Sequence, residues 1–258
     1  MTNIILPASV RNCYLFSGMA EQEKAGLLKN GQMRDYVRGD YLFRHGDPIR
    51  HFYIVCSGTV QLARQTPDGR QITIAVAVAG RSVGETKIFA PGLEHQTSAS
   101  AAQDTVAMEL PMAWMKASAQ QYPVLALNLL TELSQAAHIA SVDAEHQATM
   151  TAAQRLACFL QQLCILHNAD PLGFELPYSK ALIASRLGIK PETFSRALAT
   201  IRDYGIAVDG TRVSINDLSA VEHYVCGFCS LADECPEHQA LERKIGDGYG
   251  MRDANVTG

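Results

Sequence analysis

Short apolar runs separated by glycines fill the first half of the chain. In one run, four β-branched residues alternate strictly with their neighbours: Ile72, Ile74, Val76 and Val78. This period of two predicts a strand with one buried face, and Pro67-Asp68-Gly69 just before it has the residues of a hairpin turn. Many short strands at such spacing, after a short helix near 20–29, predict a β-roll of the jelly-roll type over residues 1–122.

Apolar and small residues follow a helical period from residue 123 to residue 148. A spacing of three and four residues relates six positions: Ala126, Leu129, Leu133, Ala136, Ala140 and Asp143. This heptad-like stripe predicts a long dimerisation helix that pairs with the same helix of a second copy. The alternative is that the stripe packs against the chain's own β-roll.

Residues 149–224 combine helical periods with one hairpin. Apolar residues share a face of a helix near 155–166, and two further helices flank a tight turn at Gly188. Pro191 suits the first turn of the second of these helices, and Asp209-Gly210 suits the turn of a hairpin wing. The expected fold class is therefore α+β, with a β-roll, a long helix and a winged helix-turn-helix.

The helix after Gly188 has one apolar and one polar face. Three apolar residues share the predicted buried face at i, i+4 and i+7: Phe194, Leu198 and Ile201. Glu192, Ser195 and Arg196 share the opposite face near the N-terminal end, where a recognition helix meets base edges. Arginine can bind guanine, glutamate can accept from cytosine, and serine can contact either. The alternative is a solvated Glu–Arg pair. Further DNA contacts are predicted at Thr193, Lys180 and Lys190.

Charge is distributed unevenly along the chain. The 258 residues include 22 basic and 26 acidic ones, a formal net charge of −4 that by itself argues against a nucleic-acid partner. Residues 179–202, however, hold five basic residues and one acidic residue, whereas residues 222–258 hold seven acidic and three basic ones. Local charge matters more than net charge to a polyanion, so the basic segment is compatible with DNA.

Several function classes are disfavoured by missing patterns. No apolar run approaches the roughly 18 residues that span a bilayer, and no basic region followed by an apolar block opens the chain. We therefore expect a cytoplasmic protein without a membrane partner, with its seven cysteines reduced. The sequence also lacks a nucleophile elbow, a P-loop and a dinucleotide-binding glycine motif, so no enzymatic activity is expected.

Over roughly residues 15–224 the chain resembles regulators of the CRP/FNR family. Three stretches match the family's sensor β-roll: Gly39-Asp-Tyr-Leu-Phe-Arg-His-Gly-Asp, Phe52-Tyr-Ile-Val-Cys-Ser-Gly and Gly84-Glu85. Pro191-Glu-Thr-Phe-Ser-Arg matches the recognition helix of the FNR-like and DNR-like branches. The resemblance implies that Glu192, Ser195 and Arg196 read TTGAT inverted repeats. It also implies a homodimer, with recognition helices about 34 Å apart, and RNA polymerase as a partner.

Cyclic AMP is the family's founding effector, held by a glutamate at the ribose and an arginine at the phosphate. Glu85 matches the glutamate, but no arginine or lysine occurs between Ile88 and Trp114. A phosphate without a cationic partner loses the charge-assisted hydrogen bonds of such a site. The β-roll is therefore expected not to bind a cyclic nucleotide, although His95 could replace part of the missing charge.

The extension 225–258 carries three cysteines, Cys226, Cys229 and Cys235, spaced C-x2-C-x5-C and followed by proline. This spacing resembles the iron–sulfur motif of FNR-like sensors. Their commoner form has that motif before the β-roll and a fourth cysteine within it, where this chain offers Cys13 and Met108. The chain is similar to a branch in which an aspartate of the dimer helix completes the set. The resemblance implies a 4Fe–4S cluster with Asp143 as fourth ligand, beside the alternative that Asp143 is solvated or caps a helix.

Other readings of the extension remain open. His223 and His238 flank the cysteines, so that one segment could bind zinc. The thiols could also form a redox switch without a metal.

Haem is a further effector of the DNR-like branch, with four candidate histidines: His51, His138, His146 and His167. Cys56, Cys158 and Cys164 are predicted to be core residues, and the Gly-, Asp- and Asn-rich end from residue 246 is predicted to be disordered.

Overall fold

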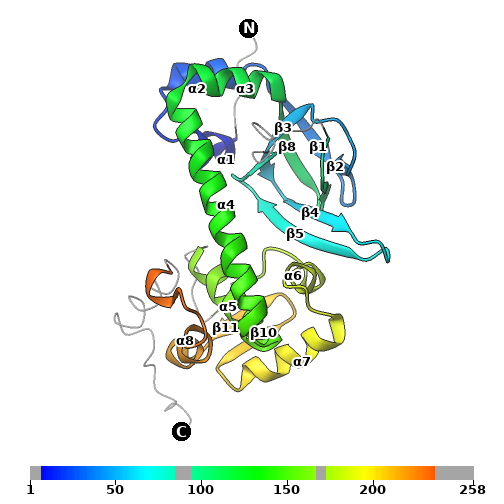
Figure 1. The fold of residues 1–258 in the computed structure, drawn as a ribbon, viewed down its shortest axis with the longest axis vertical. Coiled ribbons are helices and arrows are strands. Elements are labelled where there is room, and N and C mark those ends of the chain that lie inside the picture. Colours follow the sequence, from blue (N-terminus) through cyan, green and yellow to red (C-terminus); the bar gives the residue numbers. More distant parts are fainter. Residues whose placement is uncertain (1–6, 85–93, 167–172, 236–258) are drawn as a thin grey trace. The chain divides into compact units, whose positions relative to one another are not determined.

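The computed structural model describes residues 7–84, 94–166 and 173–235 (Figure 1). The chain divides into two compact units, residues 1–138 and 139–258. Helix α4 (Pro123–Thr149) contributes residues to both. No helix in the described ranges has both the length and the apolar character needed to cross a membrane. The predicted α+β class, with an N-terminal β-roll, a long helix and a C-terminal winged helix-turn-helix, is confirmed.

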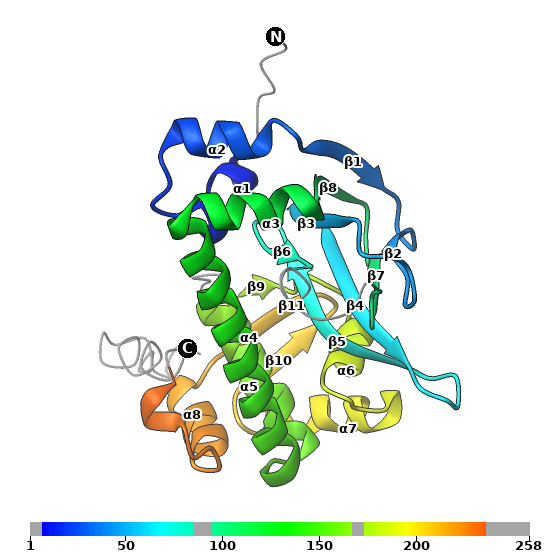
Figure 2. The ribbon, with the colours of Figure 1, turned by 45° about the horizontal axis from the view of Figure 1, so that its top comes forward.

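The first unit is an antiparallel β-roll with helices at its ends. One sheet has the order β1-β8-β3-β6 and the other β2-β7-β4-β5. The strands are β1 (Gln32–Tyr36), β2 (Tyr41–Phe43), β3 (His51–Ser57), β4 (Thr59–Gln65), β5 (Gln71–Val78), β6 (Ser82–Val83), β7 (Ser98–Ala101) and β8 (Thr105–Pro111). The helices are α1 (Ala8–Arg11), the 3-10 helix η1 (Tyr14–Phe16), α2 (Glu21–Leu28) and α3 (Met112–Gln121). Figure 2 shows α1, α2 and α3 together at one end of the roll.

Strand β3 separates the two hydrophobic cores of this unit. Phe52 and Ile54 face a core shared with the helices, whereas Tyr53 and Val55 face the interior of the roll. Each of these four side chains is at most 4% exposed, and the alternation follows from the period of two along a strand. Cys56 is buried in the first core, as predicted.

Strand β5 forms where predicted, but with the opposite face inward. Ile72 and Ile74 are 42% and 41% exposed, whereas Thr73 and Ala77 are buried. Alternation fixes which residues share a face and leaves open which face is covered. Here Gln61 Nε2 donates a hydrogen bond to Thr73 Oγ1 over 2.6 Å, and Ala77 belongs to the core of the roll.

Over the first half of α4, the stripe predicted to form the dimer contact faces the chain's own first unit, so the prediction is wrong there. Leu129 is 1% exposed and packs in the helix-side core of its own unit, and Ala126 and Leu133 are half-buried. The exposed face is instead a row with the same three-and-four spacing: Leu127, Leu130, Ser134, Ala137 and Ser141. Leu127 and Leu130 are 65% and 63% exposed. The alternative that the stripe packs on the β-roll is therefore correct for this part of the helix.

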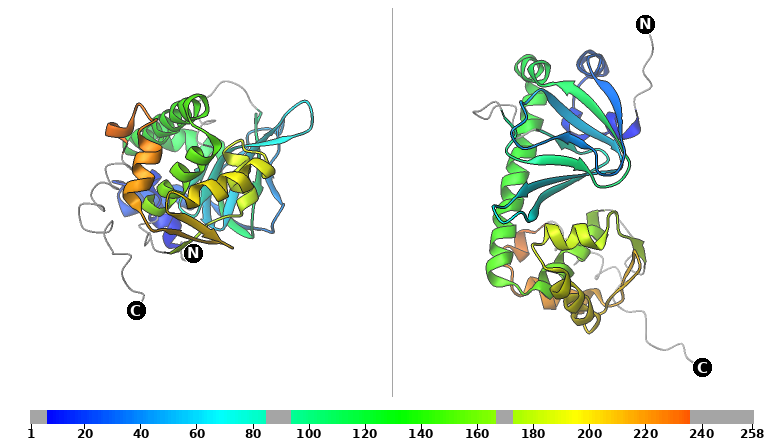
Figure 3. Two further views of the ribbon diagram at one scale, coloured as in Figure 1. Left: turned by 90° about the horizontal axis from the view of Figure 1, so that it is seen from below. Right: turned by 90° about the vertical axis from the view of Figure 1, so that its right-hand side faces the viewer.

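The second unit is a winged helix-turn-helix with a short extension. Its helices are α5 (Ala152–Leu166), α6 (Lys180–Arg186), α7 (Pro191–Arg202), α8 (Leu218–Cys226) and the 3-10 helix η3 (Ala232–Glu234). A three-stranded sheet has the order β10-β11-β9, with β9 (Phe174–Glu175), β10 (Ile206–Asp209) and β11 (Arg212–Ile215). Gly210, with φ +56°, lies in the turn of the β10–β11 wing. Figure 3 shows these helices gathered around the small sheet.

We predict that Gly58→Ala destabilises the first unit far more than Gly69→Ala. Both glycines have positive φ, +84° and +81°, which costs an alanine about 1 kcal/mol. A Cβ at Gly69 meets nothing within 4 Å, whereas at Gly58 it would clash with the Asp104 carbonyl and lie 2.7 Å from Thr105 Cα. Backbone atoms give way poorly, so Gly58→Ala should cost at least about 2 kcal/mol more.

The single tryptophan, Trp114 on α3, makes this measurable in the whole chain. Urea unfolding followed by Trp114 fluorescence reports the first unit, with the Gly69→Ala variant as matched control. Equal midpoints for the two variants would show that the close approach at Gly58 contributes nothing.

Candidate functional site

Helices α6 and α7 present the predicted recognition surface. Ser179 caps α6, because its hydroxyl oxygen accepts a hydrogen bond from the Leu182 N–H over 3.3 Å. The turn after α6 passes through Gly188, whose φ of +64° suits glycine. Pro191 then occupies the first turn of α7, where its missing N–H costs nothing. Local sequence thus fixes where both helices begin.

Helix α7 has the two faces that its sequence predicts. Phe194 and Ile201 are buried in the core of the second unit as predicted, together with Ala197, whereas Leu198 is half-buried. Four polar residues near its N-terminal end are exposed: Glu192, Thr193, Ser195 and Arg196. The Ser195 hydroxyl donates a hydrogen bond to the Pro191 carbonyl over 3.1 Å. No ion pair within the described part of the chain joins Glu192 to Arg196, so both charged groups can meet an external partner.

The basic residues around α7 differ in their availability. Lys190 is exposed at the start of α7, and Lys180 is half-exposed at the start of α6. Arg186 at the end of α6 instead forms an ion pair with Asp143 of α4, with 2.6 Å between Nη2 and Oδ2. Part of the positive charge predicted from the sequence is therefore already neutralised within the unit.

The three cysteines of the extension lie at the end of α8 and just after it. Cys226 ends α8, Cys229 lies in the next turn, and Cys235 follows η3; all three are half-buried. Burial raises the pKa of the Cys226 thiol to about 12, and the negative charges of Cys235, Glu222 and Cys229 add to the rise.

These donors are not gathered into a finished coordination site. Among the residues that the structure describes, no three histidine, cysteine or carboxylate side chains are close enough together to hold a metal ion. Nor do any of the seven cysteines, all within the described ranges, form a disulfide. The extension supplies a thiolate-rich donor set of the kind that zinc and iron–sulfur clusters use, but its side chains would have to converge on binding.

A loop around Cys229 is attached to the last turns of α4. Both Glu145 carboxylate oxygens accept hydrogen bonds from Ser230: Oε1 from the N–H over 2.7 Å and Oε2 from the hydroxyl over 2.9 Å. The Thr149 hydroxyl donates to the Glu145 carbonyl over 2.9 Å, and its oxygen lies 3.4 Å from the Phe228 carbonyl oxygen. Between these contacts, His146 Nε2 lies 3.4 Å from Cys229 Sγ. We call these contacts the helix–tail clamp.

The clamp residues carry shifted pKa values. The hydrogen bonds from Ser230 lower the pKa of Glu145, first the one from the backbone and then the one from the hydroxyl. Burial lowers the pKa of His146 below its ordinary value, and burial raises that of Cys229. Both shifts favour the neutral forms, an imidazole beside a thiol.

Sequence reasoning did not assign Glu145 or His146 to the extension. The clamp joins residues 79 to 85 positions apart, and Glu145, His146 and Thr149 form no recognised ligand spacing. Asp143, predicted as fourth ligand, has its recorded contact with Arg186. Of the other candidates, His223 is exposed, Cys13 is buried in the first unit, and His238 lies outside the described residues.

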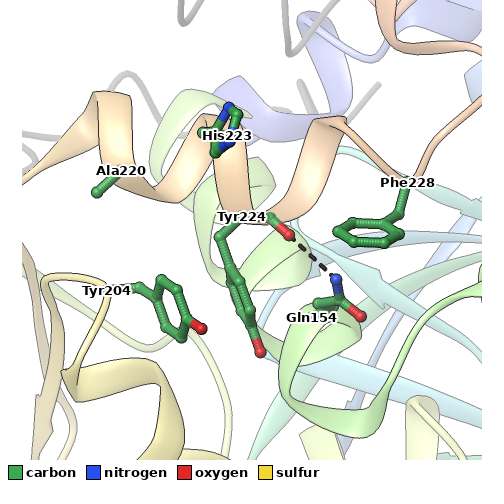
Figure 4. A pocket seen from close by; sticks show the side chains of 6 residues that line it. All are labelled: Gln154, Tyr204, Ala220, His223, Tyr224 and Phe228. Atoms are coloured by element: carbon green, nitrogen blue, oxygen red, sulfur yellow. Dashed lines mark hydrogen bonds between the residues drawn. The ribbon is translucent and has the colours of Figure 1, made fainter.

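Helix α8 is held against the DNA-reading part of the unit through aromatic contacts. Figure 4 shows a shallow pocket lined by six residues: Gln154, Tyr204, Ala220, His223, Tyr224 and Phe228. The rings of Tyr204 and Tyr224 stack with 3.6 Å between centroids, and Gln154 Nε2 donates to the Tyr224 carbonyl over 3.2 Å. Tyr204 follows α7, so α8 contacts both α5 and the segment just after the recognition helix.

The interior of the β-roll contains a buried carboxylate. Glu109 is 9% exposed, lies beside Tyr36 at hydrogen-bonding distance, and shares its strand face with Ala107 of the roll's core. His95 is 3% exposed and stacks on Phe43 with 3.6 Å between ring centroids. His95 is thus enclosed by packing, and Glu85 lies outside the described residues.

The remaining haem candidates lie on different elements. His51 is half-buried on β3 beside Tyr53, and His138 is exposed on α4. His146 contacts Cys229, and His167 lies outside the described residues. Met108, at the position matched to a fourth cysteine, is buried in the core.

Two family models match separate parts of the chain. A cyclic nucleotide-binding domain matches residues 33–122, and a Crp-like helix-turn-helix domain matches residues 154–224. The first range lies within the β-roll and α3, and the second spans α5 to α8.

Known proteins resemble the chain over most of its length. The "Cyclic AMP receptor protein" of Thermus thermophilus is 28% identical over 83% of this chain and 97% of its own. The "Anaerobic regulatory protein" of Pasteurella multocida is 26% identical over 71% of this chain and 68% of its own. A solved regulatory protein of Silicibacter pomeroyi is 30% identical, covers 84% of this chain and 96% of its own, and has a TM-score of 0.56. The chain therefore belongs to the CRP/FNR family of DNA-binding transcription regulators.

Proposed function

We propose that this regulator reads TTGAT-like inverted repeats as a homodimer and is switched by oxygen, nitric oxide or redox state through a metal centre at Cys226, Cys229 and Cys235. The observation that carries the proposal is the helix–tail clamp, because it attaches the cysteine-bearing loop to the end of α4. The name of the Pasteurella relative, an anaerobic regulatory protein, agrees with a response to oxygen.

The exposed end of α7 supplies the base-reading groups. Arg196 binds guanine O6 and N7 in a bidentate contact, Glu192 accepts from cytosine N4, and Ser195 contacts a neighbouring base. Thr193, Lys180 and Lys190 contact the phosphates, which position the protein without reading sequence. The exposure of all four polar residues at the start of α7 supports this assignment.

Dimerisation is assigned to the exposed row on α4. Leu127 and Leu130 are large apolar side chains in contact with solvent, and the row continues with small residues at Ser134, Ala137 and Ser141. Small residues let two helices approach closely in a heptad-like seam. A two-fold pair reads two half-sites one DNA turn apart, about 34 Å, and the bound dimer would recruit RNA polymerase.

The donor set fits an iron–sulfur cluster by its chemistry. Three thiols from one short segment are the ligands that such clusters use, and the raised pKa of Cys226 means that metal binding would release its proton. When bound, a 4Fe–4S cluster supplies a centre that oxygen and nitric oxide destroy. The chain's own residues hold that centre and connect it to α4 through Glu145, His146 and Thr149.

A structural zinc site is the second candidate, and one distance favours it. Zn–S and Zn–N bonds of about 2.3 and 2.0 Å at a tetrahedral angle place the two donor atoms about 3.5 Å apart. His146 Nε2 and Cys229 Sγ are 3.4 Å apart. A metal-free thiol switch and a haem site have no comparable observation in their favour.

Cyclic AMP is not assigned as the effector, although the Thermus relative is named for it. Inside the roll, the Glu109 carboxylate lies 3.5 Å from Arg34 Nη1, so this arginine already has an acidic partner. No arginine or lysine lies between Ile88 and Trp114 to bind a phosphate.

We predict that Arg196→Ala reduces discrimination at one base pair, whereas Lys180→Ala weakens binding to all sequences alike. Loss of a bidentate guanine contact should cost roughly 1–3 kcal/mol on the TTGAT repeat and little on scrambled DNA. Fluorescence anisotropy on both duplexes at one fixed salt concentration measures this, with Lys180→Ala as matched control. Equal losses on both duplexes for Arg196→Ala would refute the recognition assignment.

The identity of the metal centre is tested on protein purified without oxygen. We expect iron and sulfide in a ratio near one, with a broad visible absorption that air bleaches, because oxygen destroys exposed clusters. Cys229→Ala should lose both the metal and the absorption, whereas Cys164→Ala, in the buried core, should retain them. Zinc without colour would establish the second candidate, a sharp Soret band would indicate haem, and absence of any metal would refute the proposal.

A further inference from the structure

His146 is the α4 residue whose recorded contact in the helix–tail clamp is with a cysteine side chain. It is 8% exposed, near the end of α4, with Nε2 directed at Cys229 Sγ over 3.4 Å. Imidazole Nε2 is among the commonest metal ligands in proteins and suits both zinc and iron. A buried histidine beside a thiol therefore forms half of a mixed nitrogen–sulfur donor pair.

The helix–tail clamp holds Cys229 in this position from both sides. The residue after it, Ser230, donates two hydrogen bonds to Glu145, and the residue before it, Phe228, has its carbonyl oxygen 3.4 Å from the Thr149 hydroxyl. Glu145 and Thr149 are neighbours at i and i+4, and His146 and Thr149 at i and i+3. The contacts of the loop with these residues leave the Cys229 thiol beside His146.

Asp143 is engaged elsewhere. Its Oδ2 lies 2.6 Å from Arg186 Nη2, and the Arg186 side chain is only 19% exposed. Releasing Asp143 for ligation would leave this largely buried guanidinium without its partner, which is costly. His146 needs no such exchange, because its recorded neighbour is itself a donor of the proposed centre.

We propose that His146 is the fourth donor of the extension's metal centre, supplied by α4 in place of Asp143. This inference rests on the proposed metal centre and goes beyond it by naming the helix ligand. A single zinc ion fits the present spacing of His146 and Cys229, because two donors on one tetrahedral ion lie about 3.5 Å apart. In a cluster, His146 would supply one ligand beside the thiolates of Cys226, Cys229 and Cys235.

The test uses full-length protein reconstituted anaerobically with iron and sulfide, grown with ordinary or ¹⁵N-labelled histidine. Pulsed electron paramagnetic resonance of the reduced cluster should show a nitrogen coupling that changes with the label. His146→Ala should abolish this coupling and lower the iron content at least twofold. His146→Cys should restore the iron content without the coupling, whereas Asp143→Asn should retain both.

If the protein binds only zinc, X-ray absorption at the zinc edge replaces the magnetic measurement. Three sulfur neighbours and one imidazole are expected in the wild type, and His146→Ala should remove the imidazole signal. Circular dichroism melts of the metal-free variants control for folding, since a merely structural role would lower their melting temperature without changing the ligand signal of the metal that remains.

Several outcomes separate the two proposals. A loaded centre without nitrogen coupling would overturn the assignment of His146 and leave the metal centre intact. A nitrogen coupling that is lost in His223→Ala and kept in His146→Ala would also overturn the assignment of His146. The same holds if Asp143→Asn is the variant that loses iron while His146→Ala retains it. Wild-type protein that binds neither iron with sulfide nor zinc would overturn both.

Discussion

The attachment of one short loop to the end of α4 is the contact on which this account depends. Glu145 binds the backbone and side chain of Ser230, and Thr149 reaches Phe228, so the intervening Cys229 is held against His146. Hydrogen bonds to a charged carboxylate contribute more than neutral ones. A loop held in this way can transmit a change at its cysteines to the helix that bears the clamp.

The second unit also connects the extension to its DNA-reading surface. Helix α8 ends at Cys226, the first of the three cysteines, and its Tyr224 stacks on Tyr204, which follows α7. The same helix is tied to α5 through Gln154. A ligand that fixes the extension therefore acts on a packed set of elements that includes the recognition helix. Suppose that the loaded metal centre and the bound DNA favour the same arrangement of these elements. Thermodynamic linkage then requires that each raises the protein's affinity for the other by the same factor.

Much of the architecture follows from local patterns in the sequence. The capping Ser179, Gly188 and Pro191 fix the two reading helices, and the polar face at Glu192 and Arg196 is exposed as its spacing predicts. Periodicity alone could not choose between equivalent faces. It predicted the strand at Ile72 and the helix at Leu129. Which face of each element is buried depends on segments distant in sequence that pack against it.

The ligand set shows the same limit more sharply. Three cysteines close in sequence indicate a metal site, because they can converge without help from the rest of the fold. A donor from α4 is brought to them only by tertiary packing, and Asp143 and His146 are one turn apart on that helix. Their roles differ because Arg186 faces one and Cys229 faces the other. No local pattern encodes that difference.

The central claim is that occupancy of the extension and affinity for DNA are coupled through the clamp. The most direct measurement is the dissociation constant for a TTGAT inverted repeat, by anisotropy at fixed salt, with the centre loaded anaerobically and after its removal. The account predicts tighter binding by the loaded protein, within the roughly 5- to 150-fold range of allosteric coupling. It also predicts that Glu145→Ala shrinks this difference while Gln147→Ala, exposed on the same turn, preserves it. Equal affinities for the loaded and emptied protein would contradict the account.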